Sequence, residues 1–360
     1  MRKLLIIDGS SMLTTCYYGN LPKEVMYAKT PEEKETGYKK ILQTSNGEYT
    51  NAIYGMLKTV LKIMKEQKPS HMAIVFDKSR NTFRRQIYPE YKGNRSQTMQ
   101  PLKEQFIAAE KLFADLGIPV FYSSEYEADD YAGSLANKFW SEIPVVLMTK
   151  DVDYLQLVSD EKNIRAWMVQ PSKEKADKLF EDYMVNEELA NLPYKTFEFT
   201  EEVVREEYNL PNAKAIIDMK ALGGDTSDNI PGVKGIGPES AAKLLMEYGT
   251  IEELYSSLED WGPDIEDFWK ENLNLKKGLY KKLTAKDENI NYDAKQMAFL
   301  SKELATIKCD IPIEKSLNEF KCMLNKDAFK EICQHYEFRL SLDDYISAFK
   351  QKDRNYELGL

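Results

Sequence analysis

The chain has 360 residues, of which 42% are hydrophobic and 30% charged, and its formal net charge is −10. This length allows one large domain with an appendage or two modest domains, and the composition is typical of a soluble globular protein. No apolar stretch approaches the ~20 residues that span a bilayer, and residues 4–7 are too short for a signal peptide, so we expect a cytoplasmic protein without membrane association.

Three short apolar runs have the length of buried strands: residues 4–7, 72–76 and 145–148. Between them, residues 51–67 and 101–116 repeat apolar side chains at helical spacing. Strands that alternate with amphipathic helices predict an α/β fold with a doubly wound, mainly parallel sheet.

Each apolar run ends at or near an aspartate, namely Asp8, Asp77 and Asp151. Because ligands of such sheets bind beyond the carboxyl ends of the strands, three aspartates delivered there predict a site. Any one of them could simply end a buried strand, but the repetition favours a site.

Residues 78–103 form a basic segment with seven basic residues against one acid, Glu90. The basic residues are Lys78, Arg80, Arg84, Arg85, Lys92, Arg95 and Lys103. The net charge argues against a polyanionic partner, whereas this local run favours phosphate binding. A solvated helix face could carry the same run.

Two further groups of acids follow. Glu127, Asp129 and Asp130 open a predicted helix, where the helix dipole alone would explain one or two carboxylates but not three so readily. Asp151 and Asp153 would point the same way if their connection is extended, because alternate residues share a side.

A third pair, Asp225 and Asp228, lies in a Gly, Asp, Ser and Asn run that turn chemistry could also explain. A glycine hairpin follows, between a helical pattern at residues 215–222 and a helix from Pro238. It reads Gly232-Val233-Lys234-Gly235-Ile236-Gly237. Such glycines let a backbone approach phosphate, and the next helix start can bind an anion, although tight packing gives the same pattern.

The acids point to metal chemistry. Only two histidines occur and the four cysteines lack paired ligand spacing, so histidine triads and zinc sites are poorly supported. Crowded carboxylates need cations to stay ionised, and oxygen ligands suit Mg²⁺ or Mn²⁺. Two such ions ~3.5–4 Å apart serve phosphodiester hydrolysis. A phosphatase or polymerase could share the ions, but the basic segment and the hairpin favour a nuclease.

The chain closely resembles the 5′ nuclease family: the N-terminal nuclease domain of bacterial DNA polymerase I, phage 5′ exonucleases and flap endonucleases. The resemblance runs from residue 4 to about 248 and more weakly to about 340. Its motifs are Ile7-Asp8-Gly9-Ser10-Ser11, Val75-Phe76-Asp77, Thr82-Phe83-Arg84, Tyr88-Pro89-Glu90-Tyr91-Lys92-Gly93-Asn94-Arg95, Glu127-Ala128-Asp129-Asp130, Leu155-Gln156-Leu157-Val158-Ser159-Asp160 and Ser227-Asp228-Asn229-Ile230-Pro231-Gly232-Val233.

The resemblance implies a PIN-like catalytic domain at residues 1–205, a helix-hairpin-helix region at 206–300 and a C-terminal extension at 301–360. It implies two metal groups, the first of Asp8, Asp77, Glu127, Asp129 and Asp130, the second of Asp151, Asp153, Asp225 and Asp228. It also implies that the basic segment is an arch around a single-stranded 5′ end. Lys92 would lie near the scissile phosphate, with DNA contacts from Lys78, Arg80, Arg84, Arg85 and Arg95.

The hairpin, residues 232–237, would hold duplex DNA, with K⁺ as a candidate ion at this place. The expected substrates are DNA with 5′ flaps, nicks or free 5′ ends, and we expect a stand-alone monomer. The chain departs from the family at Thr14 and Thr15, at Lys150 and Val152, and in insertions at residues 22–41 and 167–198. A related RNA nuclease and an inactive DNA-binding module are the alternative interpretations.

Overall fold

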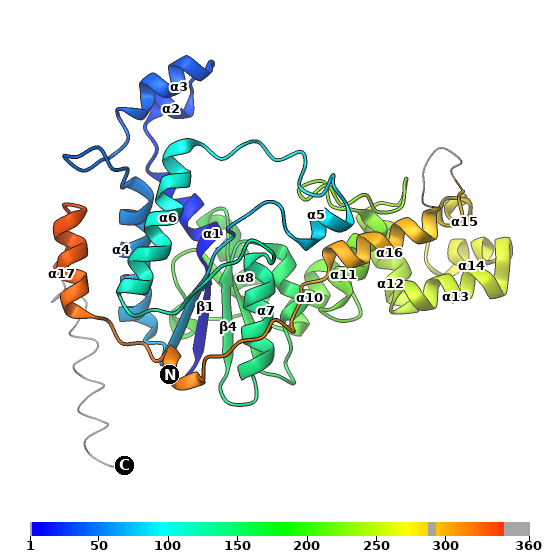
Figure 1. The fold of residues 1–360 in the computed structure, drawn as a ribbon. Coiled ribbons are helices and arrows are strands. Elements are labelled where there is room, and N and C mark those ends of the chain that lie inside the picture. Colours follow the sequence, from blue (N-terminus) through cyan, green and yellow to red (C-terminus); the bar gives the residue numbers. More distant parts are fainter. Residues whose placement is uncertain (1, 287–292, 342–360) are drawn as a thin grey trace, which may run out of the picture.

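The computed structural model describes residues 2–286 and 293–341, which include a six-stranded sheet in the order β3-β2-β1-β4-β5-β6 (Figure 1). The strands are β1 (Leu4–Asp8), β2 (His71–Val75), β3 (Val120–Phe121), β4 (Val145–Thr149), β5 (Ile164–Val169) and β6 (Thr196–Phe199). All neighbouring pairs are parallel except β5 and β6. The predicted doubly wound, mainly parallel sheet is confirmed.

Helices cover both faces of the sheet and continue into a helical region. The α-helices of the first 200 residues are α1 (Gly9–Gly19), α2 (Lys23–Met26), α3 (Pro31–Tyr38), α4 (Asn51–Gln67), α5 (Phe83–Ile87), α6 (Gln100–Asp115), α7 (Ala128–Phe139), α8 (Lys173–Asp182) and α9 (Glu187–Ala190). The later ones are α10 (Glu201–Tyr208), α11 (Ala215–Gly223), α12 (Pro238–Tyr248), α13 (Ile251–Trp261), α14 (Ile265–Asn272), α15 (Leu279–Leu283), α16 (Ala294–Ala305) and α17 (Lys326–His335). Short 3-10 helices are η1 (Val152–Leu157), η2 (Gly262–Asp264) and η3 (Leu317–Phe320). Across the described ranges, none of the helices has the length and apolar character of a membrane span.

The side chains of β1 point alternately to the two faces of the sheet, so that helices pack against this strand on both sides. Leu5 and Ile7 pack into the same cluster as α1, α4 and α6, whereas Leu4 and Ile6 pack with α7 on the other face. Because successive side chains of a strand point to opposite faces, every apolar residue of this short strand is buried. The carboxyl ends of β1, β2 and β4 therefore lie side by side at one edge, where the predicted aspartates follow.

The two predicted insertions differ in their structural role. Residues 22–41 hold α2 and α3, which project from the molecule beyond α6 and α1 (Figure 1). Residues 167–198 contribute the end of β5, the helices α8 and α9, and most of the antiparallel edge strand β6. The second segment is therefore part of the sheet, and Trp167 within it is buried.

Both predicted domain boundaries fall inside helices, and the division into domains stays a prediction. The boundary at 205/206 divides α10, and the boundary at 300/301 divides α16. The helical region is not an independent core, because Leu155 and Ala166 of the α/β part share one apolar cluster with Ile216, Ala221 and Leu244. The helices α10 to α13 continue the core beside β5.

Residues 301–341 of the predicted C-terminal extension return along the α/β part, and its residues 342–360 lie outside the described residues. After α16 the chain pairs its backbone with earlier elements, through Cys322 N to Ser70 O (2.9 Å) and Asn325 N to Leu116 O (2.9 Å). Phe320 is fully buried and stacks on Phe121, with ring centroids 5.9 Å apart. Figure 1 shows this return, which ends with α17 beside α4. This segment therefore adds Phe320 to the apolar cluster of α7, and Phe329 and Ile332 to the apolar cluster of α4.

Replacing Phe320 by alanine should lower the free energy of unfolding by about 3–5 kcal/mol, because it leaves a cavity between Phe121 and Phe139. Denaturant unfolding followed by tryptophan fluorescence measures this loss. The matched control is Met323→Ala in the same segment, where the side chain is 69% exposed and the change should stay within about 0.5 kcal/mol. Equal effects of both changes would show that the segment is only loosely attached.

Candidate active site

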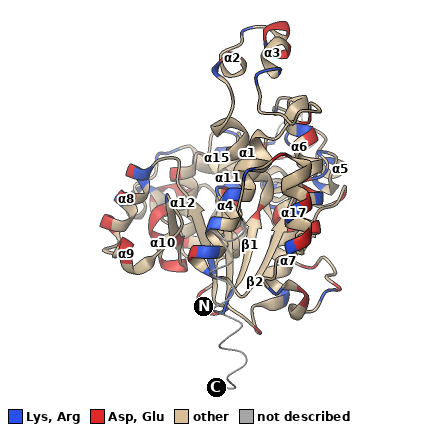
Figure 2. Cartoon of the chain, turned by 90° about the vertical axis from the view of Figure 1, so that its left-hand side faces the viewer, with Lys and Arg blue, Asp and Glu red and all other residues tan. Residues whose placement is uncertain are grey.

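The carboxyl edge of the sheet opens into a cleft of about 1440 Å³ beneath the basic segment. Acidic side chains line it from below: Asp8, Asp77, Glu127, Asp151 and Asp225. Basic side chains line it from the basic segment, from the loop after β4 and from α11: Lys78, Arg80, Arg85, Lys92, Arg95, Lys103, Lys150 and Lys220. Much of the other acid lies elsewhere, on helices such as α9 and α10 to one side of the molecule (Figure 2). The net charge of −10 therefore does not describe the cleft, which has basic side chains along one side.

Asp8 and Asp77 are positioned by the starts of helices. Asp8 caps α1, with Oδ1 accepting from Ser11 N (2.9 Å) and Oδ2 accepting from Thr149 Oγ1 (2.7 Å). Asp77 Oδ1 accepts from Ala128 N at the start of α7 (2.9 Å). Burial, joined by the charges of Asp77 and Asp151, raises the pKa of Asp8 to about 7. An extra positive charge in this cleft would therefore stabilise the ionised form.

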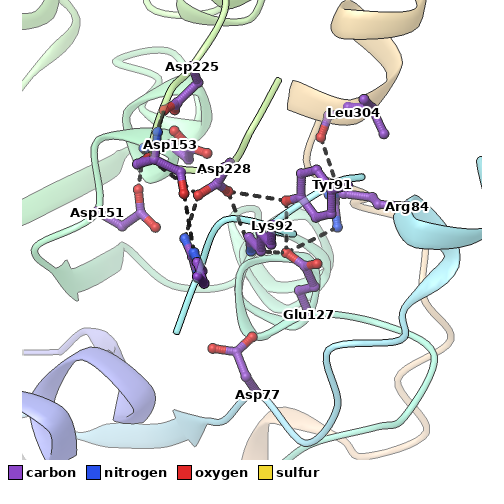
Figure 3. A network of polar contacts seen from close by, with 12 residues as sticks. Asp77, Arg84, Tyr91, Lys92, Glu127, Asp151, Asp153, Asp225, Asp228 and Leu304 are labelled. Atoms are coloured by element: carbon purple, nitrogen blue, oxygen red, sulfur yellow. Dashed lines mark hydrogen bonds and ion pairs between the residues drawn. The ribbon is translucent and has the colours of Figure 1, made fainter. Parts of the chain in front are cut away.

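Glu127 is one of the acids that the basic segment neutralises directly. Its Oε2 lies 2.5 Å from Lys92 Nζ, while Oε1 accepts from Thr82 Oγ1 (2.9 Å). Burial opposes ionisation of Glu127, but the cations of Lys92 and Arg84 outweigh it and hold the pKa below its usual range. Tyr91 OH also lies 3.2 Å from Glu127 Oε2. Lys92 is therefore already inserted among the carboxylates, as Figure 3 shows.

Arg84 and Asp130 form a buried pair that changes two predictions. The two terminal guanidinium nitrogens of Arg84 donate to the two oxygens of Asp130, at 2.8 and 2.7 Å, and Arg84 is 1% exposed. Asp130 also accepts from Glu127 N and Lys308 N. The predicted DNA contact of Arg84 and the predicted metal-ligand role of Asp130 do not fit this arrangement, because neither group faces the cleft and both are fully bonded.

Asp129 differs from Asp130 in that its carboxylate is not fully hydrogen bonded among the described residues. Its Oδ1 is buried and has no hydrogen-bond partner within the described part of the chain. Burial and the neighbouring charge of Asp130 raise the pKa of Asp129 well above its usual value. A buried carboxylate oxygen without a partner is costly, so this position favours a cation.

The second predicted group is built around Lys220 of α11. Asp151 caps η1 and accepts from Asp153 N (3.0 Å), so this connection is a 3-10 turn and not the extended segment that the sequence suggested. Lys220 Nζ forms ion pairs with Asp153 and with Asp225 Oδ2, the latter at 2.6 Å. Although burial opposes it, Lys220 and Ser227 lower the pKa of Asp225 to about 2.

Asp228 joins the second group to the basic segment. Arg95 donates to Asp228 Oδ1, and Lys92 Nζ lies 3.4 Å from Asp228 Oδ2. Tyr91 OH lies 3.2 Å from the same oxygen and bridges Asp228 to Glu127. Figure 3 shows Tyr91, Lys92 and Asp228 meeting between the two acid groups.

In residues 2–286 and 293–341, no three Asp, Glu, His or Cys side chains converge closely enough to hold a metal ion. The physical reason is visible in the ion pairs, since Lys92, Arg95 and Lys220 stand between the carboxylates of both groups. Five of the predicted acids line the cleft, namely Asp8, Asp77, Glu127, Asp151 and Asp225. Asp153 and Asp228 lie behind them in ion pairs with Lys220, Arg95 and Lys92, and Asp130 is paired with Arg84 away from the cleft.

The other predicted DNA-binding residues of the basic segment, Lys78, Arg80 and Arg85, line the cleft, and each is partly engaged by other groups of the chain. Arg80 donates to Arg95 O (3.1 Å), which links the two halves of the basic segment. Lys78 Nζ lies 2.5 Å from Glu110 Oε2 of α6. Arg85 Nε donates to Pro89 O (3.2 Å) and lines the cleft.

The glycine hairpin divides into buried and exposed positions. Gly232 has a φ of 61°, and a Cβ there would lie 2.3 Å from Gly224 N, so only glycine fits. Val233 and Ile236 are buried, so their side chains anchor the hairpin and cannot contact DNA. Lys234, Gly235 and Gly237 are exposed. Lys282 Nζ donates to Gly235 O (2.9 Å), which gives this carbonyl an internal cation where the sequence suggested K⁺.

Sequence reasoning missed Lys220 and the bridging role of Tyr91. A signal for Lys220 was present, because a single lysine among Ile216, Ile217, Ala221 and Leu222 must find an acidic partner when the helix is buried. Thr14 and Thr15, which replace the expected aromatic and arginine, line the cleft with Tyr18.

Comparison with known proteins agrees with this geometry. Residues 3–190 match the family model "5′-3′ exonuclease, N-terminal resolvase-like domain", and residues 211–328 match "5′-3′ exonuclease, C-terminal SAM fold". DNA polymerase I of Caldicellulosiruptor bescii is 36% identical over 94% of this chain and 33% of its own length. DNA polymerase I of Bacillus caldotenax is 34% identical over 88% of this chain and 29% of its own length. The chain thus spans about a third of these relatives.

Solved structures share the fold at low identity. The 5′-exonuclease of phage T5 with bound zinc has a TM-score of 0.56 and 20% identity, covering 85% of this chain and 90% of its own. A T5 flap endonuclease variant in a pseudo-enzyme–product complex with DNA and metal ions has a TM-score of 0.54 and 20% identity, covering 96% and 99%. Since the N-terminal model alone matches more than half of the sequence and the C-terminal model follows it in order, the chain belongs to the 5′-3′ exonuclease family of nucleases, which hydrolyse phosphodiester bonds.

Proposed function

We propose that this chain hydrolyses DNA at free 5′ ends, nicks and 5′ flaps, with two Mg²⁺ or Mn²⁺ ions bound by the acids of the cleft. The observation that carries the proposal is the arrangement of charge, with carboxylates on the floor of one cleft and the basic segment across it. The acids suit divalent ions and the bases suit a phosphate backbone.

The chemistry of the donor set fits the ions, and binding one would draw the acids of a group closer together than they lie in the described residues. The members of the donor set are carboxylates, they include the unpartnered Oδ1 of Asp129, and the pKa of Asp8 is raised by burial as expected for a charge that lacks a counter-ion. We assign one ion to Asp8, Asp77, Glu127 and Asp129, and the other to Asp151, Asp153, Asp225 and Asp228. Such ions, when bound, supply activation of water and neutralisation of the departing oxygen.

The chain's own groups would hold and orient the DNA. Lys92 and Arg95 lie at the boundary of the two acid groups, so each can turn from a carboxylate toward the phosphate between them. Arg85, Lys78 and Lys103 line the passage for a single-stranded 5′ end. The exposed Lys234, Gly235 and Gly237 would contact the duplex backbone without reading its sequence.

The relatives support this proposal. The T5 flap endonuclease variant was solved with DNA and metal ions, and the catalytic core of Rad2 with a DNA substrate, at a TM-score of 0.50 and 16% identity over 97% of this chain and 92% of its own. The monomeric state, the cytoplasmic location and K⁺ at the hairpin stay predictions.

The double change Asp225→Asn and Asp228→Asn tests the function. It removes acids of the second ion and releases Arg95, while Lys220 keeps its pair with Asp153, so flap binding should be preserved or strengthened while cleavage falls by orders of magnitude. Binding of end-labelled 5′-flap DNA is measured in Ca²⁺, and cleavage of flap, nicked, blunt and matched RNA substrates in Mg²⁺, at one salt concentration.

Glu187→Gln with Glu188→Gln on α9 is the matched control, because it removes two charges away from the cleft and should leave both readouts unchanged. A parent protein that cuts none of the substrates would favour the inactive binding module. Preferential cleavage of RNA would favour the RNA nuclease. A double variant as fast as the parent would remove the second ion from the proposal.

Asp8→Asn should stabilise the metal-free protein at high pH. The pKa of Asp8 is about 7 in the folded chain and about 4 in an unfolded one. Between these values the folded state holds a proton that the unfolded state has lost, so the free energy of unfolding falls as the pH rises from about 4 to 7. Above that range the ionised carboxylate costs at most about 4 kcal/mol, which asparagine removes. Unfolding in EDTA at pH 8 and pH 5 measures the gain, which should shrink at pH 5.

Adding Mg²⁺ should reverse the order, because the parent gains more from the ion than the variant. Asp310→Asn, at a side chain that is 75% exposed, is the control and should change neither measurement. A variant less stable than the parent in EDTA at both pH values would show that Asp8 is held by its hydrogen bonds alone.

Gly237→Trp should weaken duplex binding by roughly tenfold or more while leaving bound-state cleavage nearly intact, since the hairpin would contact only backbone. The structure allows the change, because a Cβ at Gly237 meets nothing within 4 Å and its φ of −102° is ordinary. Gly19→Trp, which also meets nothing within 4 Å, is the control. The measurement is fluorescence anisotropy with duplex DNA beside single-turnover cleavage. Unchanged affinity with lost cleavage would contradict a DNA-binding hairpin.

A further inference from the structure

Two segments more than 130 residues apart interlock at the centre of the site. Residues 88–95 of the basic segment lie against the loop at residues 225–230, which a backbone pair between Asp225 and Ile230 closes on itself (2.9 and 2.8 Å). The first segment carries Lys92, and the second carries Asp225 and Asp228. Their relative placement therefore decides where Lys92 stands among the acids.

Two asparagine side chains join the segments, and each donates a hydrogen bond from its own segment to a backbone carbonyl of the other. Asn94 Nδ2 donates to Thr226 O (2.6 Å), and Asn229 Nδ2 donates to Glu90 O (2.7 Å). Between them, Lys92 N donates to Asp228 O (2.8 Å). The acceptors are all backbone carbonyls, so the interlock fixes the course of the main chain and leaves the charged side chains free to exchange partners.

The backbone at Lys92 needs such support. Its φ is 53°, in the left-handed region that a lysine rarely adopts without an imposed constraint. Asn229 has a φ of 55°, which asparagine tolerates well, and this turn directs its side chain to Glu90. The hydrogen bonds on both sides of Lys92 thus maintain the conformation that points its ammonium at Glu127 and Asp228.

We propose that Asn94 and Asn229 are positioning residues for Lys92, and that they tie the basic segment to the loop of the second acid group. This inference rests on the proposed function in one respect, namely that Lys92 acts at the phosphate. Neither asparagine needs to contact DNA. Their effect on the reaction passes through the placement of Lys92.

Asn229→Gly is the sharpest variant, because glycine accepts a φ of 55° without strain and removes only the side-chain donor. Single-turnover cleavage of a 5′ flap should slow by about tenfold, in the range that one hydrogen bond contributes, with flap affinity in Ca²⁺ within about twofold. Asn94→Ala should act in the same direction. Asn209→Gly, at the C-cap of α10 with a φ of 51°, is the matched control and should keep the parent rate.

A double-mutant cycle with Lys92→Ala separates positioning from a general structural role. In the Lys92→Ala background, Asn229→Gly should cause less than about a twofold further loss, because the residue that it positions is gone. A second readout avoids catalysis. The acylation rate of Lys92, followed by mass spectrometry in metal-free protein, should rise several-fold in Asn229→Gly and stay unchanged in Asn209→Gly.

The outcomes are distinguishable. A tenfold loss from Asn229→Gly in both backgrounds, or unchanged acylation of Lys92, would overturn the positioning role while leaving the nuclease assignment intact. A Lys92→Ala protein with the parent rate would instead remove Lys92 from the proposed function and the positioning role with it. Non-additive rates together with faster acylation support the interlock.

Discussion

The site depends on one electrostatic constraint, which is that many carboxylates share a small volume. Like charges at close range raise one another's pKa, so each acid must be protonated, paired or shared with a cation. The described residues solve this by pairing: Lys92 with Glu127, Arg84 with Asp130, Lys220 with Asp153 and Asp225, and Arg95 with Asp228. Asp8 and Asp129 have no such partner, and burial raises the pKa of both. The same charges that would bind divalent ions thus hold the folded cleft together without them.

The pairs fall into two kinds with different consequences. Arg84 and Asp130 are sealed from solvent and fully hydrogen bonded, so they behave as part of the scaffold. Lys92, Arg95 and Lys220 lie at or beside the cleft and can exchange a carboxylate for a phosphate or give way to an ion. Breaking a pair of the first kind leaves a buried charge, whereas breaking one of the second kind exposes it to water and ligands.

The sequence predicts the sheet and the acids well because both follow local rules. Buried strands such as β1 are continuous apolar runs, and the aspartate that ends each run is carried to the same edge by the parallel topology. The strand β3 has two residues and β6 lies within an apparent insertion, so neither has a pattern long enough to recognise. The burial of Arg84 could not be predicted either. A basic residue within a basic segment gives no sign that its guanidinium binds Asp130, Leu304 O and Thr306 O in the interior.

The bonds that enclose Arg84 also set an order of events during synthesis. Its contacts with Leu304 O and Thr306 O span 220 and 222 residues, whereas its pair with Asp130 spans only 46. A chain that emerges from its N-terminus can form the sheet and the Arg84–Asp130 pair early, but the guanidinium then lacks two of its carbonyl partners until α16 has followed. Contacts of such long range form late and slowly. The acids of the cleft are therefore synthesised long before Arg84, at the base of the basic segment, is fixed, and its last two contacts form only when α16 folds back onto α5.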